Sequence, residues 1–191
     1  VLNNHPSVSD ENREKVCEVI EALNYRPSFT ARQMRTNSSE LVGFGLISDE
    51  VIITPHAVDM IRGAQETLWA IGKVMLVINS GYGTDITAAA FEAMLERRVD
   101  GIIFASSFHR PVELPFESSE VPIILANCYS ADREYPSVVP DEFSGGYTAT
   151  KTLVDKGHQR IGFINLGTDP LASLPPVDAS TGRLEGYKQA L

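Results

Sequence analysis

The stretch LVGFGLI at residues 41–47 is a continuous apolar run of strand length. Its residues do not alternate between apolar and polar, a pattern typical of a strand that is covered on both faces. Four similar runs follow along the chain: VMLVI (74–78), GIIFA (101–105), PIILAN (122–127) and RIGFI (160–164). The sequence therefore predicts five buried strands.

Segments with helical periodicity separate these runs. In HAVDMIRGAQETLWAIG, residues 56–72, apolar side chains recur on one helical face. Comparable stretches are DITAAAFEAMLERR (85–98), FSGGYTATKTLVDKG (143–157) and RLEGYKQAL (183–191), whereas SADREYPSVVP (130–140) indicates a loop with a short extended segment. Alternating strands and helices predict right-handed βαβ units, and hence an α/β fold with a doubly wound parallel sheet.

A separate amphipathic helix is predicted before the first strand, over residues 9–25. Ser9 or Asp10 can cap its start, and Pro27 is expected to end it. Its apolar residues form one narrow stripe, which cannot build a core alone. The segment is therefore either a helix that packs on the main domain or the last helix of a small bundle.

Composition excludes several classes of protein. Of the 191 residues, 43% are hydrophobic, and the formal net charge is −9. These values favour a globular domain and argue against a generally basic, nucleic-acid-coating surface. Residues 26–36 are the exception, because they carry three arginines and no acid and would accept phosphate. No apolar run is long enough to span a membrane, and no secretory signal is visible.

The cysteines and histidines do not form a metal-binding pattern. Cys17 and Cys128 lie far apart, and the four histidines are scattered along the chain. We therefore expect reduced thiols, as in the cytosol, with neither a metal site nor a cofactor.

Polar residues follow the predicted strands at their carboxyl ends, where open α/β sheets bind ligands. Neutral and acidic groups of this kind suit a polyhydroxylated ligand, although polar residues also cap helices at such junctions. Arg183 opens the last predicted helix and could grip two ligand oxygens, or it could be an ordinary surface arginine. The strand-end set is Ser48, Asp49, Asn79, Ser80, Ser106, Ser107, Asn127 and Asp141.

Catalytic signatures are weak. The sequence has no phosphate-binding P-loop and no nucleophile elbow, and the GFG at residues 43–45 lacks the third glycine of a dinucleotide fingerprint. Pairs of carboxylates are present, but their spacing does not require acid–base chemistry. The sequence therefore predicts a binding protein and no enzyme.

Several motifs occur in the order found in the LacI family of bacterial regulators. They are VLN (1–3), the helix from Ser9 through Val16, NYRP (24–27), ARQM (31–34), the strand 41–47, DKGHQRIGFI (155–164) and TGRLEGYKQAL (181–191). The chain closely resembles this family from end to end.

The resemblance implies a fold and a domain order. The fold is the periplasmic-binding-protein type of α/β sheet, preceded by a remnant of a helix-turn-helix headpiece. Residues 1–25 would be the C-terminal part of that headpiece, and 26–40 the hinge. Residues 41–158 would form the N-terminal subdomain of the effector domain, and 159–191 the start of its C-terminal subdomain. Relative to the family, we expect the chain to be truncated at both ends.

The resemblance also implies sites. Met34 would wedge between base pairs from the minor groove, which the flanking arginines favour. Alignment through Gly145 and Gly146 puts Pro140 in the column of a ligand-binding aspartate and Asp141 one residue later. The expected DNA-binding residues are Asn3, Arg26, Ala31, Arg32, Met34 and Arg35, and the expected ligand-binding residues are Asp49, His56, Ser107, Asp141 and Arg183.

We therefore predict a cytoplasmic, homodimeric repressor that binds operator DNA and senses a small molecule, which we expect to be a carbohydrate. A periplasmic-type sugar receptor without DNA binding is the first alternative, and an α/β enzyme acting on sugars is the second.

Overall fold

The computed structural model describes residues 8–26, 28, 33, 38–47, 54–81, 84–114, 120–132, 135–165 and 177–191. The chain splits into two compact units, Val1–Ser39 and Glu40–Leu191.

The helix of the first unit is α1 (Asp10–Ala22), and Ser9 caps it by accepting a hydrogen bond from the Asn12 amide at 3.4 Å. The helix ends at Ala22, before the end that Pro27 was expected to set. Asn24 adopts a left-handed conformation, with φ of 46°, and the Tyr25 amide donates to the carbonyl of Ile20. This closing turn is one that asparagine tolerates better than most residues, so Asn24 ends the helix before the proline is reached.

The second unit contains a five-stranded sheet with strand order β2-β1-β3-β4-β5 in which all neighbouring pairs are parallel. This confirms the predicted α/β class. The strands are β1 (Leu41–Ile47), β2 (Val74–Ser80), β3 (Gly101–Pro111), β4 (Ile123–Tyr129) and β5 (Ser137–Val138). The helices are α3 (Pro55–Ala70), α4 (Thr84–Glu96), α5 (Glu142–Asp155) and α6 (Asp178–Ala190).

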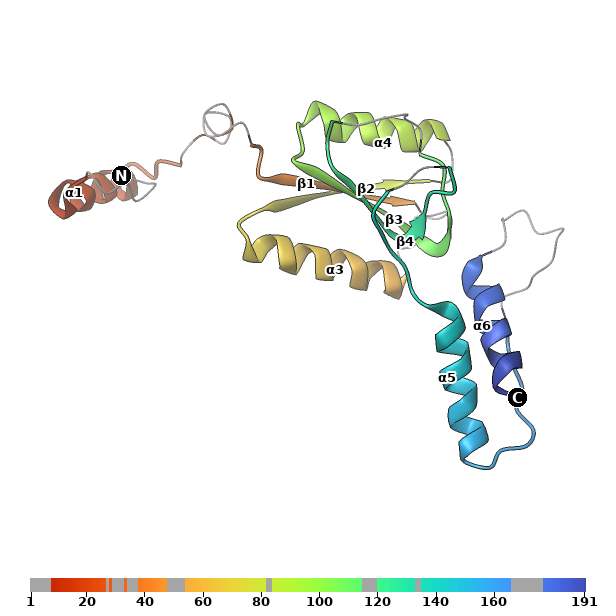
Figure 1. Cartoon of the computed structure of the whole chain (residues 1–191). Helices are drawn as coiled ribbons and strands as arrows, with labels where there is room; N and C mark the ends of the chain where they lie inside the picture. The colour runs from red at the N-terminus through yellow and green to blue at the C-terminus, as the bar shows by residue number, and fades with distance from the viewer. Residues whose placement is uncertain are drawn as a thin grey trace. The chain divides into compact units, whose positions relative to one another are not determined.

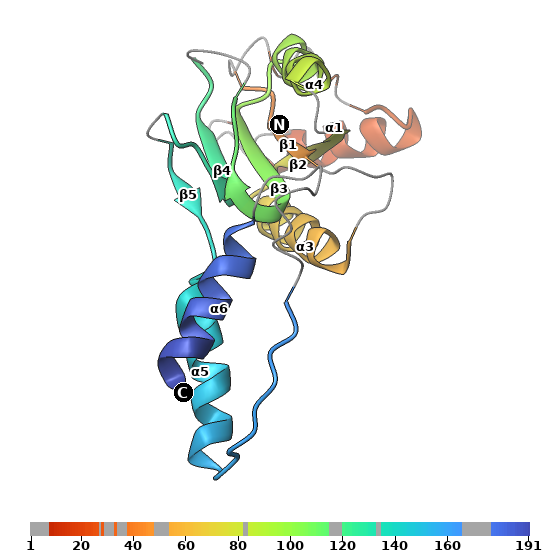
Figure 2. The same cartoon turned by 90° about the vertical axis from the view of Figure 1, so that its right-hand side faces the viewer.

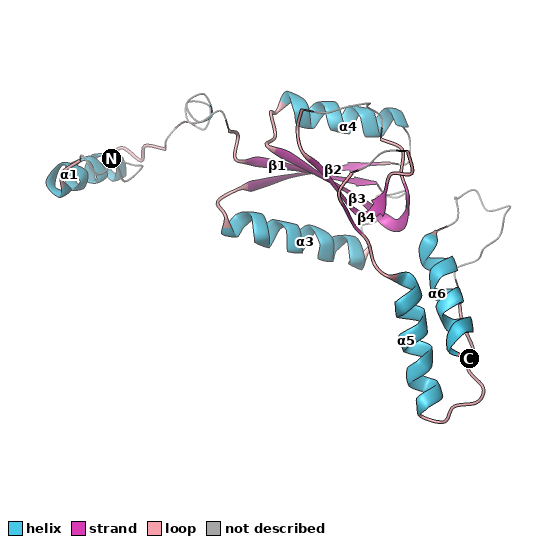
Figure 3. Cartoon of the chain, in the orientation of Figure 1, coloured by secondary structure: helices cyan, strands magenta, loops and turns pink. Residues whose placement is uncertain are grey.

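Helices α3 and α4 cover opposite faces of the sheet (Figure 1; the same layers are coloured by secondary structure in Figure 3). Phe44 and Leu46 of β1 pack with Ala57 of α3, whereas Ile47 belongs to the cluster that contains Phe91 of α4. Alternate residues of β1 therefore face different helices. This is why the strand is apolar throughout and why its sequence does not alternate.

The predicted strand RIGFI (160–164) is not a strand in the structure. Residues 158–165 are extended but pair with no other strand among the described residues. The backbone instead accepts a hydrogen bond from the Tyr187 hydroxyl at the carbonyl of Ile161, at 2.7 Å. A β-branched run needs a neighbouring strand to complete its ladder, and a sequence pattern does not report whether one is available.

Helices α5 and α6 lie side by side in both views, with the extended segment running alongside them (Figure 2). Among the described residues, no helix is long and apolar enough to cross a membrane.

Candidate functional site

The carboxyl end of β3 is irregular, and this irregularity builds the site. Between Ala105 and Arg110 the strand advances five residues, while its neighbour β4 advances only two, from Ala126 to Cys128. Such a bulge lets a strand redirect its side chains, and bulges are frequent beside functional sites. The bulged segment carries Ser107 and His109.

Asn127 of β4 lies opposite the bulge and stabilises it. The residue is buried and left-handed, with φ of 55°, and its side-chain amide donates to the carbonyl of Ser106 at 2.9 Å. Ser106 in turn accepts a hydrogen bond from the Phe108 amide through its hydroxyl, at 3.3 Å. These two members of the strand-end set therefore satisfy backbone groups within the sheet.

An ionic cluster connects the bulge to the amino-terminal ends of α5 and α6. Arg183 of α6 donates from Nε to Glu142 Oε2 of α5 at 2.5 Å. His109 Nδ1 lies 3.5 Å from Glu142 Oε1, and its Nε2 lies 4.0 Å from an Asp178 carboxylate oxygen. Glu142 and His109 are nearly buried, with side chains 7% and 12% exposed. Three elements thus bring one imidazole, one guanidinium and two carboxylates together.

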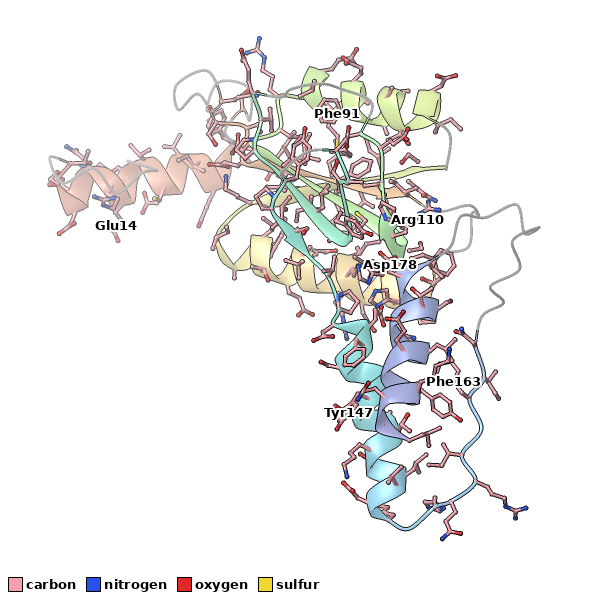
Figure 4. All side chains as sticks on the ribbon, turned by 45° about the vertical axis from the view of Figure 1, so that its right-hand side comes forward. Glu14, Phe91, Arg110, Tyr147, Phe163 and Asp178 are labelled. Atoms are coloured by element: carbon pink, nitrogen blue, oxygen red, sulfur yellow. The ribbon has the colours of Figure 1, made fainter. Side chains whose placement is uncertain are left out.

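Tyr129, at the end of β4, adds a phenol to this cluster. A hydrogen bond with Asp178 is the main cause that raises the pKa of Tyr129, followed by burial and the charge of the same carboxylate. The ring of His109 packs edge-on against the Tyr129 ring, with centroids 5.9 Å apart. Figure 4 shows Asp178 where α6 begins, beside the sheet.

Three polar atoms near these elements are buried and lack a hydrogen bond among the described residues. They are Ser107 Oγ, His109 Nδ1 and Ser180 Oγ. A buried polar group without a partner costs free energy, so such groups are rare in folded proteins and are often found at functional sites. These unpaired atoms mark the cluster as the candidate site of the described residues.

Glycines set the distance between α5 and α6, and thereby place Arg183. A Cβ atom on Gly146 would lie 2.2 Å from the carbonyl oxygen of Arg183, and one on Gly186 would lie 2.2 Å from that of Phe143. Only glycine permits so close a crossing. The close contact explains why Gly146 and Gly186 are glycines, and it holds Arg183 beside Glu142.

The predicted ligand residues meet the cluster to different degrees. Arg183 belongs to it, and Ser107 lies on the same bulge as His109. Asp141 caps α5, because its carboxylate accepts a hydrogen bond from the Ser144 amide at 2.9 Å, and this bond lowers the pKa of Asp141. His56 is exposed in the first turn of α3, and the described residues include no hydrogen bond or ion pair from it to the cluster. Asp49 lies outside the described residues.

Of the predicted DNA-binding residues, the structure describes Arg26, which is exposed after α1. The other five, Asn3, Ala31, Arg32, Met34 and Arg35, lie outside the described residues, so their roles remain predictions.

Sequence reasoning missed four members of the cluster: His109, Tyr129, Glu142 and Asp178. The bulge displaces His109 from the expected strand end, and α6 begins at Asp178, five residues before the predicted helix start. Glu142 follows Asp141 directly, so the signal available in the sequence was an acidic pair at a helix start. Among the described residues, no group of three or more His, Cys, Asp or Glu side chains could hold a metal ion.

Two family profiles match the chain. Residues 44–191 match the one described as periplasmic binding proteins and sugar binding domain of LacI family, and residues 1–28 match bacterial regulatory proteins, lacI family. The sucrose operon repressor of Escherichia coli is 31% identical over 100% of this chain and 55% of its own length. The repressor PurR of Mannheimia succiniciproducens is 29% identical with the same coverage. The chain spans about half the length of the curated relatives it matches.

Solved structures agree on the fold. A putative transcriptional regulator protein of the LacI family from Rhizobium etli is 28% identical with a TM-score of 0.69 over 79% of this chain and 51% of that one. The lac repressor dimer bound to operator and the anti-inducer ONPF is 21% identical with a TM-score of 0.74, over 99% of this chain and 55% of that one. Because a family profile covers most of the chain, the chain belongs to the LacI family of bacterial regulatory proteins.

Proposed function

We propose that this chain is part of a cytoplasmic repressor that binds operator DNA as a homodimer and changes its DNA affinity when a sugar binds. One observation carries the proposal: a single chain matches a regulatory-protein profile over residues 1–28 and a sugar-binding profile over residues 44–191. The sucrose operon repressor and PurR, to which the chain is similar, are both named as repressors, and the proposal includes no catalysis.

The cluster around Arg183 is the proposed effector site. It lies at the carboxyl ends of β3 and β4, the edge at which parallel α/β sheets bind ligands. Its carboxylates accept hydrogen bonds, its guanidinium donates them, and its imidazole can do either, which suits the hydroxyl groups of a sugar. Ser107 and Asp141 remain proposed ligand contacts beside it, with His56 and Asp49 proposed from the neighbouring strand end.

The outer face of α3 and the edge strand β2 are the proposed dimer contact. Trp69 is 72% exposed there, Val58 lies on the same side of α3, and Val77 is exposed on the face of β2 that carries Met75 and points toward α3. A group of large exposed apolar side chains on one face is typical of a protein-binding surface, whereas single exposed apolar residues are common on any protein. A second copy of the chain would cover this face, as twofold dimers do with self-complementary patches.

The test is binding of operator-type DNA by the intact protein, with and without a panel of neutral sugars, followed by fluorescence anisotropy. We expect one sugar to change the affinity, and we expect Met34→Ala to weaken specific binding by roughly tenfold or more, because the proposed wedge is lost. Thr67→Ala on α3 is the control and should leave DNA affinity unchanged.

Two results would contradict the proposal. If the intact protein binds a sugar but has no specific DNA affinity at any salt concentration, the sugar-receptor interpretation is correct. If it binds DNA but no sugar alters the affinity, the effector belongs to another chemical class.

A further inference from the structure

The ion pair between Arg183 and Glu142 affects which ligands the proposed effector site can bind. The Glu142 side chain is 7% exposed, whereas that of Arg183 is 56% exposed. Nε of the guanidinium is occupied by Glu142. Among the described residues, Glu142 is the side chain that pairs with Arg183. The outer part of the guanidinium is therefore accessible, but its charge is already balanced by a buried carboxylate.

Asp178 shifts the charge balance further. Glu142 and Asp178 contribute two negative charges and Arg183 one positive charge, so the cluster is formally negative when His109 is neutral. A buried charge acts more strongly than an exposed one, because water and salt screen it less. With the buried Arg110 of the same bulge counted as well, the formal charge is zero, so an incoming phosphate or carboxylate group would meet no excess positive charge.

The same groups favour uncharged hydroxyls. Glu142 and Asp178 offer acceptor oxygens, and Arg183 retains donors that Nε does not use. The buried His109 Nδ1 and Ser107 Oγ atoms have no hydrogen-bond partner among the described residues. A hydroxyl group can donate to the carboxylates and accept from the guanidinium. The oxygens of a phosphate dianion can accept from the guanidinium, but they have no proton to donate to the carboxylates and are repelled by them.

We propose that Glu142 is a specificity-determining residue that restricts the effector to uncharged polyhydroxyl compounds and excludes phosphorylated sugars. The inference rests on the proposed function, in that it assigns the effector site to this cluster. It goes beyond that function by naming the charge class of the effector and the residue that sets it.

The experiment compares Glu142→Gln with the unaltered intact protein, without DNA and at low salt. Binding of inorganic phosphate, D-glucose 6-phosphate and D-glucose is measured by calorimetry. Glutamine retains the shape of glutamate but removes the carboxylate that pairs with Arg183, so the formal charge of Arg183, Glu142 and Asp178 together becomes less negative by one. We expect the variant to gain at least roughly tenfold in affinity for inorganic phosphate and the sugar phosphate. Affinity for D-glucose should not rise.

Two further variants keep the test decisive. Glu185→Gln changes the same charge on an exposed turn of the same helix and should gain no phosphate affinity. Asp178→Asn removes the more exposed carboxylate of the cluster and should produce a smaller gain in the same direction. If circular dichroism shows that Glu142→Gln does not fold, the phosphate affinity of Asp178→Asn tests the inference instead.

Two outcomes would overturn the inference: preferential binding of the sugar phosphate by the unaltered protein, or no gain in phosphate affinity in a folded charge-removal variant. These outcomes are separate from failure of the proposed function, because no DNA is present. A sugar phosphate that releases operator DNA would support the repressor and refute the role of Glu142. If the intact protein binds no operator DNA but Glu142→Gln gains phosphate affinity, the repressor function is refuted and the role of Glu142 is supported.

Discussion

The two cysteines differ in environment. Cys17 is exposed on α1, whereas Cys128 is buried in the sheet, where its thiol contacts the carbonyl of Phe104 at 3.6 Å. Burial is the main cause that raises the pKa of Cys128 from 9.0 to about 12. Because the thiolate is the reactive form, Cys128 is doubly protected, by lack of access and by lack of charge.

The first prediction concerns thiol reactivity and stability in alkali. In the folded protein at neutral pH, a chromogenic disulfide reagent should modify Cys17 rapidly and Cys128 only after unfolding. The raised pKa means that the folded state retains a proton that the unfolded state loses. The associated stability is therefore fully present below pH 9.0 and is lost as pH rises toward about 12. The loss is about 1.4 kcal/mol per pH unit within that window.

Denaturant unfolding at a series of alkaline pH values measures this dependence. Cys128→Ala should show a shallower fall of the unfolding free energy with pH than Cys17→Ser, which keeps the buried thiol. Equal slopes in the two variants would show that the buried thiol does not control the alkaline transition.

The second prediction concerns Arg26, which is exposed beyond the end of α1. If it contacts a phosphate, Arg26→Ala should weaken binding to specific and non-specific DNA alike. The slope of log affinity against log salt should fall by roughly one. Arg97→Ala serves as the control, because Arg97 is an exposed arginine directly after α4 that pairs with Glu96, away from the proposed dimer contact. A loss confined to one operator sequence would mean that Arg26 reads bases.

At the scale of elements, the close packing of α5 against α6 depends on Gly146 but not on its neighbour Gly145. Gly146 faces α6 at the crossing, whereas a Cβ on Gly145 would meet no atom within 4 Å. In the sequence the two residues are adjacent glycines that look equivalent. Only the crossing of α5 and α6 shows that Gly146 needs to be glycine and Gly145 does not.

The third prediction follows from this difference. Gly146→Ala should destabilise the protein by about 1–3 kcal/mol or more, because the methyl group would force the helices apart. Gly145→Ala should be neutral or stabilising by up to about 1 kcal/mol, because alanine favours helix at an exposed position. Urea denaturation of the intact protein measures both, and equal effects of the two variants would contradict the observed crossing.

Elements were predictable where local chemistry determines them. The run at residues 41–47 became β1 with the same bounds, because its apolar residues satisfy two helical layers at once. The run at residues 160–164 has similar chemistry but no strand pairs with it among the described residues, so it stays extended. The pattern of apolar residues indicates which side chains a segment could bury. Whether the segment pairs as a strand depends on the neighbours that the rest of the chain provides.

At the scale of the whole molecule, the exposed apolar face of α3 and β2 leads to the fourth prediction. Val58→Glu should shift the intact protein from dimer toward monomer in sedimentation velocity, because a charge would be buried in the proposed contact. Ile86→Glu is the matched control, since Ile86 is similarly exposed on α4, on the opposite face of the sheet (Figure 1). A monomeric Ile86→Glu variant beside a dimeric Val58→Glu variant would place the interface on α4.

The candidate site was predictable only in part, because it is assembled from distant segments. The carboxyl edge of the sheet followed from the alternation of strands and helices, and Arg183 from a motif at a predicted helix start. His109 was not expected, since a bulge of three extra residues in β3 decides where it lies. Glu142 became recognisable only when the helix crossing brought it to Arg183, which is 41 residues further along the chain.

The strand order β2-β1-β3-β4-β5 has a consequence for how the chain leaves the ribosome. β1 and β2 can pair first, and β3 then adds to the free side of β1. β4 adds beside β3, and β5 adds beside β4. None of the strands that the structure describes must insert between two that are already paired. The sheet can therefore grow outward in the order of translation, which shortens the time for which each apolar edge is exposed to other nascent chains.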